Sequence, residues 1–161
     1  MLVVADSSPL NVLVRLGYVD VLPKLFKVVI IPDTVRAELS APTTPEVVQR
    51  FTASAPSWLV VETVVNSPVI EGIDAGEAAA IYLAQLRAAE FLLIDDKDGR
   101  REAVARGIPI IGTVGILGAA SRVGLLVLSE AVEQLLKTDF RVDQRILEDA
   151  LKRDAASRRQ R

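Results

Sequence analysis

Continuous apolar runs and amphipathic segments alternate along this chain. Four runs are apolar throughout, at residues 2–5, 28–31, 91–94 and 108–111. Such short runs without polar alternation are typical of strands buried on both faces of a parallel sheet. A fifth run, residues 58–64, alternates towards its end and indicates a strand near a sheet edge. The pattern predicts an α/β fold, a three-layer α/β/α domain with a mostly parallel sheet of four to five strands.

The segments between these runs have apolar residues at helical spacing. In the first of them we expect Ser7 or Ser8 to cap a helix and Gly17 to end it. No repeat or long linker divides the chain, so we expect one domain, with its core at residues 1–128. Residues 129–161 should add C-terminal helices and a basic tail, packed on or extending from that domain. Further helices are expected at residues 18–26, 33–39, 45–54, 78–89, 99–106, 113–123, 129–137 and 143–155.

The stretch from Phe91 to Arg100 is the most informative part of the chain. An apolar strand runs directly into three carboxylates, Asp95, Asp96 and Asp98. In parallel sheets the ligand crevice lies just beyond the carboxyl ends of the strands. Carboxylates this close repel one another unless a cation or a proton lies between them, and a hard cation accounts for the cluster. The alternative is a polar turn in which one Asp caps the following helix.

The composition narrows the chemistry that such a crevice could perform. The chain contains no Cys and no His. These absences exclude disulfide frameworks, Cys nucleophiles, Ser-His-Asp triads and zinc sites with His ligands. A hydrolase of this composition must use carboxylates, hydroxyls, Lys or Arg, and a bound cation.

The net charge of −2 hides an uneven distribution. Residues 152–161 carry five basic side chains and one acid, a net charge of +4, which leaves −6 on the rest. This tail suits either an anionic partner or a solvated helix end. No apolar run approaches the roughly 18 residues that span a bilayer, and the first strand lacks the features of a signal peptide. We therefore expect a cytoplasmic protein with no membrane association.

Four acidic residues are expected to converge at one edge of the sheet. Asp6 follows the first strand, Glu38 lies in the helix after the second, Glu77 begins an Ala-rich helix, and Asp96 follows the Phe91 strand. Any one of them could be an ordinary helix-end or surface residue. Together, in a chain without His, they predict oxygen ligands for Mg²⁺ or Mn²⁺, ions that activate water and neutralise charge on a phosphoryl group.

Five blocks of sequence carry a resemblance to a known family. Their order along the chain resembles PIN-domain proteins, and more narrowly the prokaryotic branch of predicted nucleic-acid-binding PIN proteins of unknown function. The resemblance extends from residue 2 to about residue 125, and the combination is specific although each block alone is weak. The blocks are Asp6 to Leu10, Ile31 to Leu39, Asp74 to Ile81, Leu93 to Arg100 and Ile111 to Leu117.

The resemblance implies a metal-dependent endoribonuclease that holds one or two Mg²⁺ or Mn²⁺ ions. Glu77 stands where many relatives have Asp, so the reach of its carboxylate differs. Asp98 would either cap the following helix or support the metal indirectly. Lys97 and Arg100 would hold a substrate phosphate, although Lys97 also suits a solvated helix start. The implied catalytic residues are Asp6, Glu38, Glu77 and Asp96, the metal ligands are these four and Asp95, and the supporting residues are Ser7, Asp98, Arg100 and Thr113.

The same residues are also compatible with two other kinds of protein. Asp96 to Gly99 also matches the first motif of haloacid-dehalogenase-like phosphatases, but the later Lys and acidic pair of that family are missing. The stronger alternative is a non-catalytic PIN-like module that binds RNA or protein. The low aromatic content and the acidic body make strong RNA affinity less obvious. By analogy with toxin members of the family, the expected partners are RNA, a small antitoxin and a second copy of the chain.

Overall fold

One five-stranded sheet forms the centre of the molecule in the computed structural model, which describes residues 1–161. The strand order is β3-β2-β1-β4-β5, and every neighbouring pair is parallel. The predicted α/β/α architecture is confirmed, and the strand expected near an edge, β3, is an edge strand. The strands are β1 (Leu2–Ala5), β2 (Val28–Pro32), β3 (Leu59–Glu62), β4 (Phe91–Leu93) and β5 (Ile110–Ile111).

Helices connect the strands and cover both faces of the sheet. Most lie where apolar spacing predicted them, with ends that differ by a few residues. None of the helices combines the length and the apolar character that a membrane-spanning helix needs. The helices are α1 (Ser7–Leu16), α2 (Val21–Leu25), α3 (Asp33–Leu39), α4 (Glu46–Ala53), α5 (Ala75–Leu86), α6 (Lys97–Ala105), α7 (Thr113–Arg122), α8 (Leu128–Leu136) and α9 (Gln144–Arg159).

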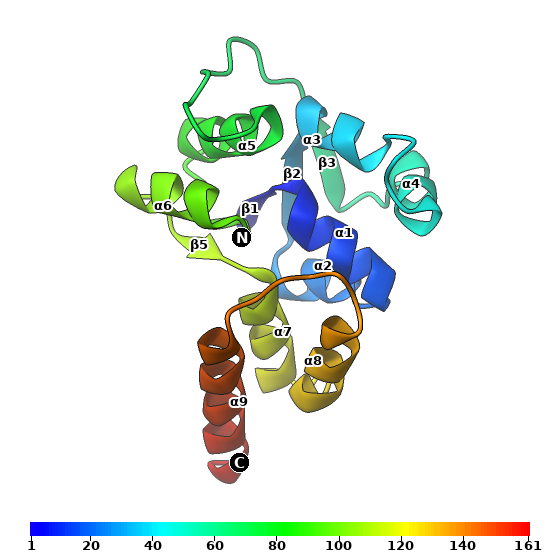
Figure 1. Ribbon diagram of the computed structural model, residues 1–161, viewed down its shortest axis with the longest axis vertical. Coiled ribbons are helices and arrows are strands. Elements are labelled where there is room, and N and C mark those ends of the chain that lie inside the picture. Colours follow the sequence, from blue (N-terminus) through cyan, green and yellow to red (C-terminus); the bar gives the residue numbers. More distant parts are fainter.

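Two apolar clusters explain why the inner strands are hydrophobic on both faces. Val3 and Ala5 of β1 belong to the larger cluster, which includes side chains from α1, α7 and α8. Val4, between them in sequence, belongs to the smaller cluster with side chains of α5 and α6. Successive strand residues point to opposite faces, so a strand covered by helices on both sides has no position for a polar residue. Figure 1 shows α5 and α6 on one side of the sheet and α1, α3 and α4 on the other.

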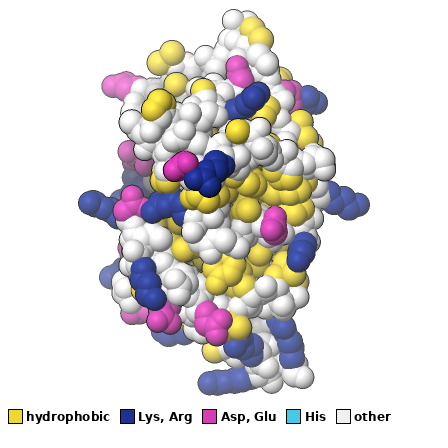
Figure 2. Space-filling view, turned by 90° about the vertical axis from the view of Figure 1, so that its right-hand side faces the viewer, with side chains coloured by type: hydrophobic (Ala, Val, Ile, Leu, Met, Phe, Trp, Pro, Cys, Tyr) yellow, Lys and Arg dark blue, Asp and Glu magenta, His cyan; other side chains and the backbone are white.

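The last two helices form an extension below the sheet. α9 lies beside α7, and the segment at residues 137–143 crosses from α8 to the start of α9 (Figure 1). Leu147 of α9 is buried, and the hydroxyl of Ser121 in α7 donates to buried Asp154 at 2.5 Å. Figure 2 shows hydrophobic side chains gathered at the centre of one face and Lys and Arg side chains at its lower end. Arg158 and Arg159 of the basic tail form the last turn of α9, where cations suit the helix dipole.

The sheet order places a crevice beyond β1 and β4. The chain moves outwards from β1 to β2 and β3, then crosses to β4 on the other side of β1. Ligands bind at such a switch point in open parallel sheets. Ala5 pairs with Leu93, and the N–H of Asp6 donates to the carbonyl of Leu93 at 2.9 Å. The residues that follow β1 and β4 are therefore brought together.

The helix starts that follow β1 and β4 differ from the prediction. α1 begins at Ser7 with Asp6 in the N-cap position, so neither Ser7 nor Ser8 is the cap. α6 begins at Lys97, because Asp96 accepts hydrogen bonds from the next turn and starts the helix two residues before Gly99. Both shifts place a carboxylate at the junction between a strand and a helix.

Candidate functional site

Asp6 is a buried carboxyl group whose hydrogen bonding is incomplete. Its side chain is 3% exposed, and its Oδ1 atom has no hydrogen-bond partner. Burial raises its pKa from 3.8 to about 7, the Ser7 backbone N–H lowers it in part, and the charges of Glu38, Asp74 and Asp95 raise it further. Buried polar atoms are nearly always paired, so a carboxylate oxygen without a protein partner at this depth is suited to a cation, a water molecule or a proton.

Glu77 is the second acid with a strongly raised pKa. It lies in the first turn of α5, where its backbone N–H donates to the Asp74 carboxylate at 2.8 Å. Burial raises the pKa of Glu77 to about 8, and the charges of Asp74, Asp6 and Asp96 add to this effect. The carboxylates of Glu77, Asp74, Asp6 and Asp96 thus lie close enough for their negative charges to repel one another. Such a set gains most from a cation because each ionised member destabilises the others.

Glu38 reaches the same region from α3. It accepts a hydrogen bond from the Ser7 hydroxyl at 2.8 Å, and the Gly76 backbone also stabilises its charge. Burial nevertheless raises its pKa, with a further contribution from Asp74. A Cβ atom at position 76 would lie 2.0 Å from Glu38 Oε1, a distance that no side chain tolerates. Gly76 is therefore required for Glu38 to occupy its position.

Asp95 holds two helix starts in place. One oxygen, Oδ2, accepts from the hydroxyls of Ser8 at 3.0 Å and Thr113 at 2.7 Å. The other, Oδ1, accepts from the Thr113 backbone N–H at 2.7 Å. Asp95 thus links the start of α1 to that of α7. Its role as a metal ligand stays a prediction, and its observed partners make it a positioning group.

Asp96 combines a structural contact with a free oxygen. Its Oδ2 accepts from the backbone N–H groups of Asp98 at 3.0 Å and Gly99 at 3.1 Å, so it is the N-cap of α6. The helix cap expected in the polar-turn alternative is therefore present. The other carboxylate oxygen of Asp96, Oδ1, makes no hydrogen bond to protein. Asp98 does not cap the helix: its side chain is 62% exposed and lies 3.8 Å from Arg101.

A large cleft of about 1290 Å³ opens onto these groups. It contains most of the predicted site residues, together with Lys97. Glu38 does not line the cleft, but it accepts a hydrogen bond from Ser7, which does. Asp98 does not line the cleft either. The predicted residues that line the cleft are Asp6, Ser7, Glu77, Asp95, Asp96, Arg100 and Thr113.

The donor set is suited to a hard divalent cation. All candidate ligands are carboxylate oxygens, and one of them, on Asp6, is orphaned and buried. Burial, with a further contribution from neighbouring carboxylates, raises the pKa of Asp6, Glu38 and Glu77. The side chains do not, however, form a group of three or more acids arranged around one ion position. The chemistry of these residues therefore suits a divalent cation, and joint coordination would require the side chains to move.

Sequence reasoning missed two residues of this site. Asp74 raises the pKa of Asp6, Glu38 and Glu77, and it also lines the cleft. Its place before the Ala-rich segment predicts only a helix start, and Asp74 does cap α5. Ser8, expected as a possible cap, instead binds Asp95. The sequence does carry a signal for Asp74, because it is a second acid only three residues before Glu77.

Comparisons with known proteins identify the family. A family model described as a PIN domain, DUF3368, matches residues 2–155. Among solved structures, the fold is similar to that of a PilT N-terminus domain protein from the hyperthermophilic archaeon Sulfolobus solfataricus P2. The two have a TM-score of 0.50 and 14% identity, over 89% of this chain and 100% of the other. A comparison with curated proteins gives no match. Because the family model covers nearly the whole chain, this protein belongs to the PIN-domain family.

Proposed function

We propose that this protein is a Mg²⁺- or Mn²⁺-dependent endoribonuclease that hydrolyses RNA phosphodiester bonds. PIN domains form a superfamily of nucleases, and the coarse assignment follows from membership. The observation that carries the finer proposal is Asp6: a buried acid with an unpartnered oxygen, surrounded by further carboxylates in an open cleft. A domain that only binds a partner has no physical reason to retain this repulsion.

Each residue has a distinct task in the proposed reaction. Asp6, Glu38, Glu77 and Asp96 would hold the ion, which supplies an activated water and neutralises charge on the phosphoryl group. Ser7 holds the Glu38 carboxylate in place through its hydroxyl. No His is present to act as a general base, so the carboxylates of the site would take up the proton.

Cationic side chains in the cleft support a phosphate-containing substrate. Arg100 lies against Gly112, where an added Cβ would be 2.7 Å from its Nη1 and 3.2 Å from Asp95 Oδ1. Arg100 therefore reaches the edge of the acidic site while forming no ion pair within 4 Å. Lys97, at the start of α6, also lines the cleft. These two residues are placed to contact a substrate phosphate.

Partners beyond RNA belong to the same proposal. A small antitoxin or a second copy of the chain would need an apolar surface to bind. Hydrophobic side chains do gather at the centre of the face shown in Figure 2. The role as the toxin of a toxin–antitoxin pair stays a prediction. Light scattering after size-exclusion chromatography tests the homodimer, and co-expression with the neighbouring gene product tests the antitoxin.

Cleavage of a mixed single-stranded RNA pool tests the enzymatic proposal. The wild type should cut RNA with Mg²⁺ or Mn²⁺ and not with EDTA. Asp6→Asn keeps the shape of the side chain and removes its charge, so it should abolish cleavage while the fold remains intact. Glu133→Gln removes one charge from an exposed position on α8 and should have no effect. Absence of cleavage by the wild type would instead favour the non-catalytic binding module.

A further inference from the structure

The cleft has a second side, which the carboxylate site does not explain. It is formed by the segment before α9 and by one face of that helix, and we call it the C-terminal wall. Ile146, Asp149, Ala150 and Arg153 recur at helical spacing and all line the cleft. The residues of the C-terminal wall are Asp139, Phe140, Arg141, Val142, Asp143, Ile146, Asp149, Ala150 and Arg153.

Most cations around the cleft have no carboxylate partner. Six basic side chains line it, and only Arg15 forms an ion pair, at 2.8 Å from Asp139. Arg141 and Arg153 of the C-terminal wall are exposed and unpaired. The other five lining cations are Lys97, Arg100, Arg122, Arg141 and Arg153.

The acids of the C-terminal wall are mostly occupied by structural contacts. Asp139 is paired with Arg15, and Asp143 caps α9 by accepting from the Arg145 N–H at 2.8 Å. Asp149 is the remaining one, exposed one turn before Arg153 without forming an ion pair. The three acids and two arginines of the C-terminal wall give it no net positive charge, so it can hold an anion only through the unpaired guanidinium groups of Arg141 and Arg153.

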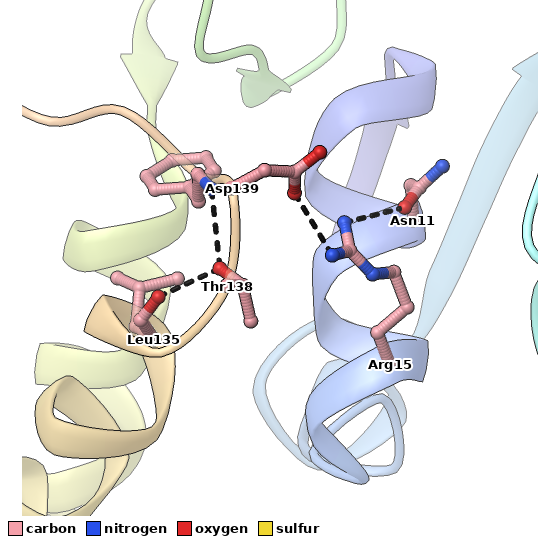
Figure 3. A network of polar contacts seen from close by, with 6 residues as sticks. Asn11, Arg15, Leu135, Thr138 and Asp139 are labelled. Carbon is pink, nitrogen blue, oxygen red and sulfur yellow. Dashed lines mark hydrogen bonds and ion pairs between the residues drawn. The ribbon is translucent and has the colours of Figure 1, made fainter.

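A hydrogen-bond network anchors the segment before α9 (Figure 3). Arg15 of α1 holds Asp139, and the Thr138 hydroxyl donates to the Leu135 carbonyl at 2.6 Å. The backbone N–H of Phe140 donates to the Thr138 hydroxyl at 3.2 Å. Phe140 is thus positioned by its own backbone, and it is the one aromatic side chain that lines the cleft. A half-buried ring at a cleft surface offers a platform for a base.

We propose that the C-terminal wall binds a single RNA strand beside the carboxylate site. Arg141 and Arg153 contact backbone phosphates, and Phe140 stacks on a base. Ions at the acidic site neutralise only the phosphate that is cut, whereas its neighbours need cations from the protein to enter an acidic cleft. The identity of the ligand as RNA rests on the proposed function, whereas the presence of two unpaired arginines and an aromatic ring on one side of the cleft does not.

Binding without cleavage tests this inference. A labelled, unstructured RNA of about 12 nucleotides is titrated with protein in EDTA, and anisotropy gives Kd at several salt concentrations. The double variant Arg141→Ala, Arg153→Ala should bind about 10-fold more weakly or worse. Its slope of log K against log salt should be smaller by about 1.4, the value for two lost contacts to a single strand.

A matched control separates the C-terminal wall from general charge. Arg145 and Lys152 are exposed on α9 but do not line the cleft. The double variant Arg145→Ala, Lys152→Ala removes the same charge and should bind RNA like the wild type. Equal weakening by both double variants, or weakening by neither, would overturn the proposal. The melting temperature of each variant shows that its fold is retained.

Two further arms test the base contact and the single strand. Phe140→Leu should raise Kd by about 5-fold or more without changing the salt slope, because it removes stacking and leaves charge unchanged. An unchanged Kd would remove Phe140 from the site. An unlabelled duplex of the same sequence should compete poorly, and equal competition would contradict single-strand binding. Since no arm requires metal or turnover, a protein that binds in this way yet cuts nothing would sink the nuclease proposal alone.

Discussion

Replacing Asp6 by Asn should stabilise the metal-free protein while inactivating it. The folded state raises the pKa of Asp6 from 3.8 to about 7, chiefly through burial. A carboxyl group with a raised folded pKa binds protons more tightly in the folded than in the unfolded chain. The contribution of proton binding at Asp6 to the free energy of unfolding is therefore complete below about pH 4, and it is lost as pH rises through about 7. Asn carries no charge, so the variant avoids this loss.

The size of the effect follows from the pKa. A rise from 3.8 to about 7 corresponds to about 4 kcal/mol of unfavourable free energy once Asp6 is fully ionised. Asn leaves a buried amide that must find partners, which costs about 1–3 kcal/mol. We expect a net stabilisation of about 1–3 kcal/mol. For a domain of this size, each kcal/mol raises Tm by about 2–4 °C.

Thermal unfolding in EDTA measures this directly. Wild type and Asp6→Asn are compared by circular dichroism from about pH 5 to about pH 8, with Glu133→Gln as the control. The gain in Tm of the Asn variant should grow up to about pH 7 and then level off. Adding Mn²⁺ should reverse the order, because the ion stabilises only the protein that binds it.

Two results would refute this reasoning. A variant that is less stable than wild type throughout would show that the Asp6 carboxylate makes a favourable contact in the metal-free protein. A gain that does not depend on pH would show that the effect comes from packing rather than from ionisation. In either case the orphaned Oδ1 atom would no longer indicate a ligand.

Two further predictions concern positioning. Gly76→Ala should reduce the initial rate of RNA cleavage at least about 10-fold, because the added Cβ would displace Glu38. Gly118→Ala is the control: its Cβ would meet only an ordinary van der Waals contact, so the rate should stay unchanged. The folded protein should persist in both cases, and full activity in Gly76→Ala would show that Glu38 is dispensable. Ser121→Ala should lower the free energy of unfolding in urea by about 1–3 kcal/mol, because buried Asp154 loses its hydroxyl donor, and an unchanged value would contradict that contact.

Strand positions were predictable because both faces of this sheet are covered. A continuous apolar run such as residues 91–94 has few alternatives in a chain of alternating strands and helices. Helix starts were less predictable, because several residues with suitable caps stand next to one another. At residues 6–8 an acid and two hydroxyls compete, and tertiary contacts decide: Ser7 binds Glu38, and Ser8 binds Asp95.

The site was predictable where it depends on strand ends and hidden where it depends on packing. Asp6 and Asp96 follow neighbouring strands, so their proximity is a consequence of the parallel sheet. The dependence of Glu38 on Gly76 could not be predicted, because it arises from the close approach of α3 and α5. The C-terminal wall was hidden as well, since residues 137–143 give no sign in sequence that they cross the cleft.

Binding of Mn²⁺ in the absence of RNA tests the central claim most directly. Electron paramagnetic resonance measures the free Mn²⁺ that remains as increasing amounts of wild type, Asp6→Asn or Glu133→Gln are added to a Mn²⁺ solution. A shared carboxylate site predicts that wild type and Glu133→Gln remove the free signal equally, and that Asp6→Asn binds at least about 10-fold more weakly. Equal binding by Asp6→Asn, or none by the wild type, would contradict a metal site at these carboxylates.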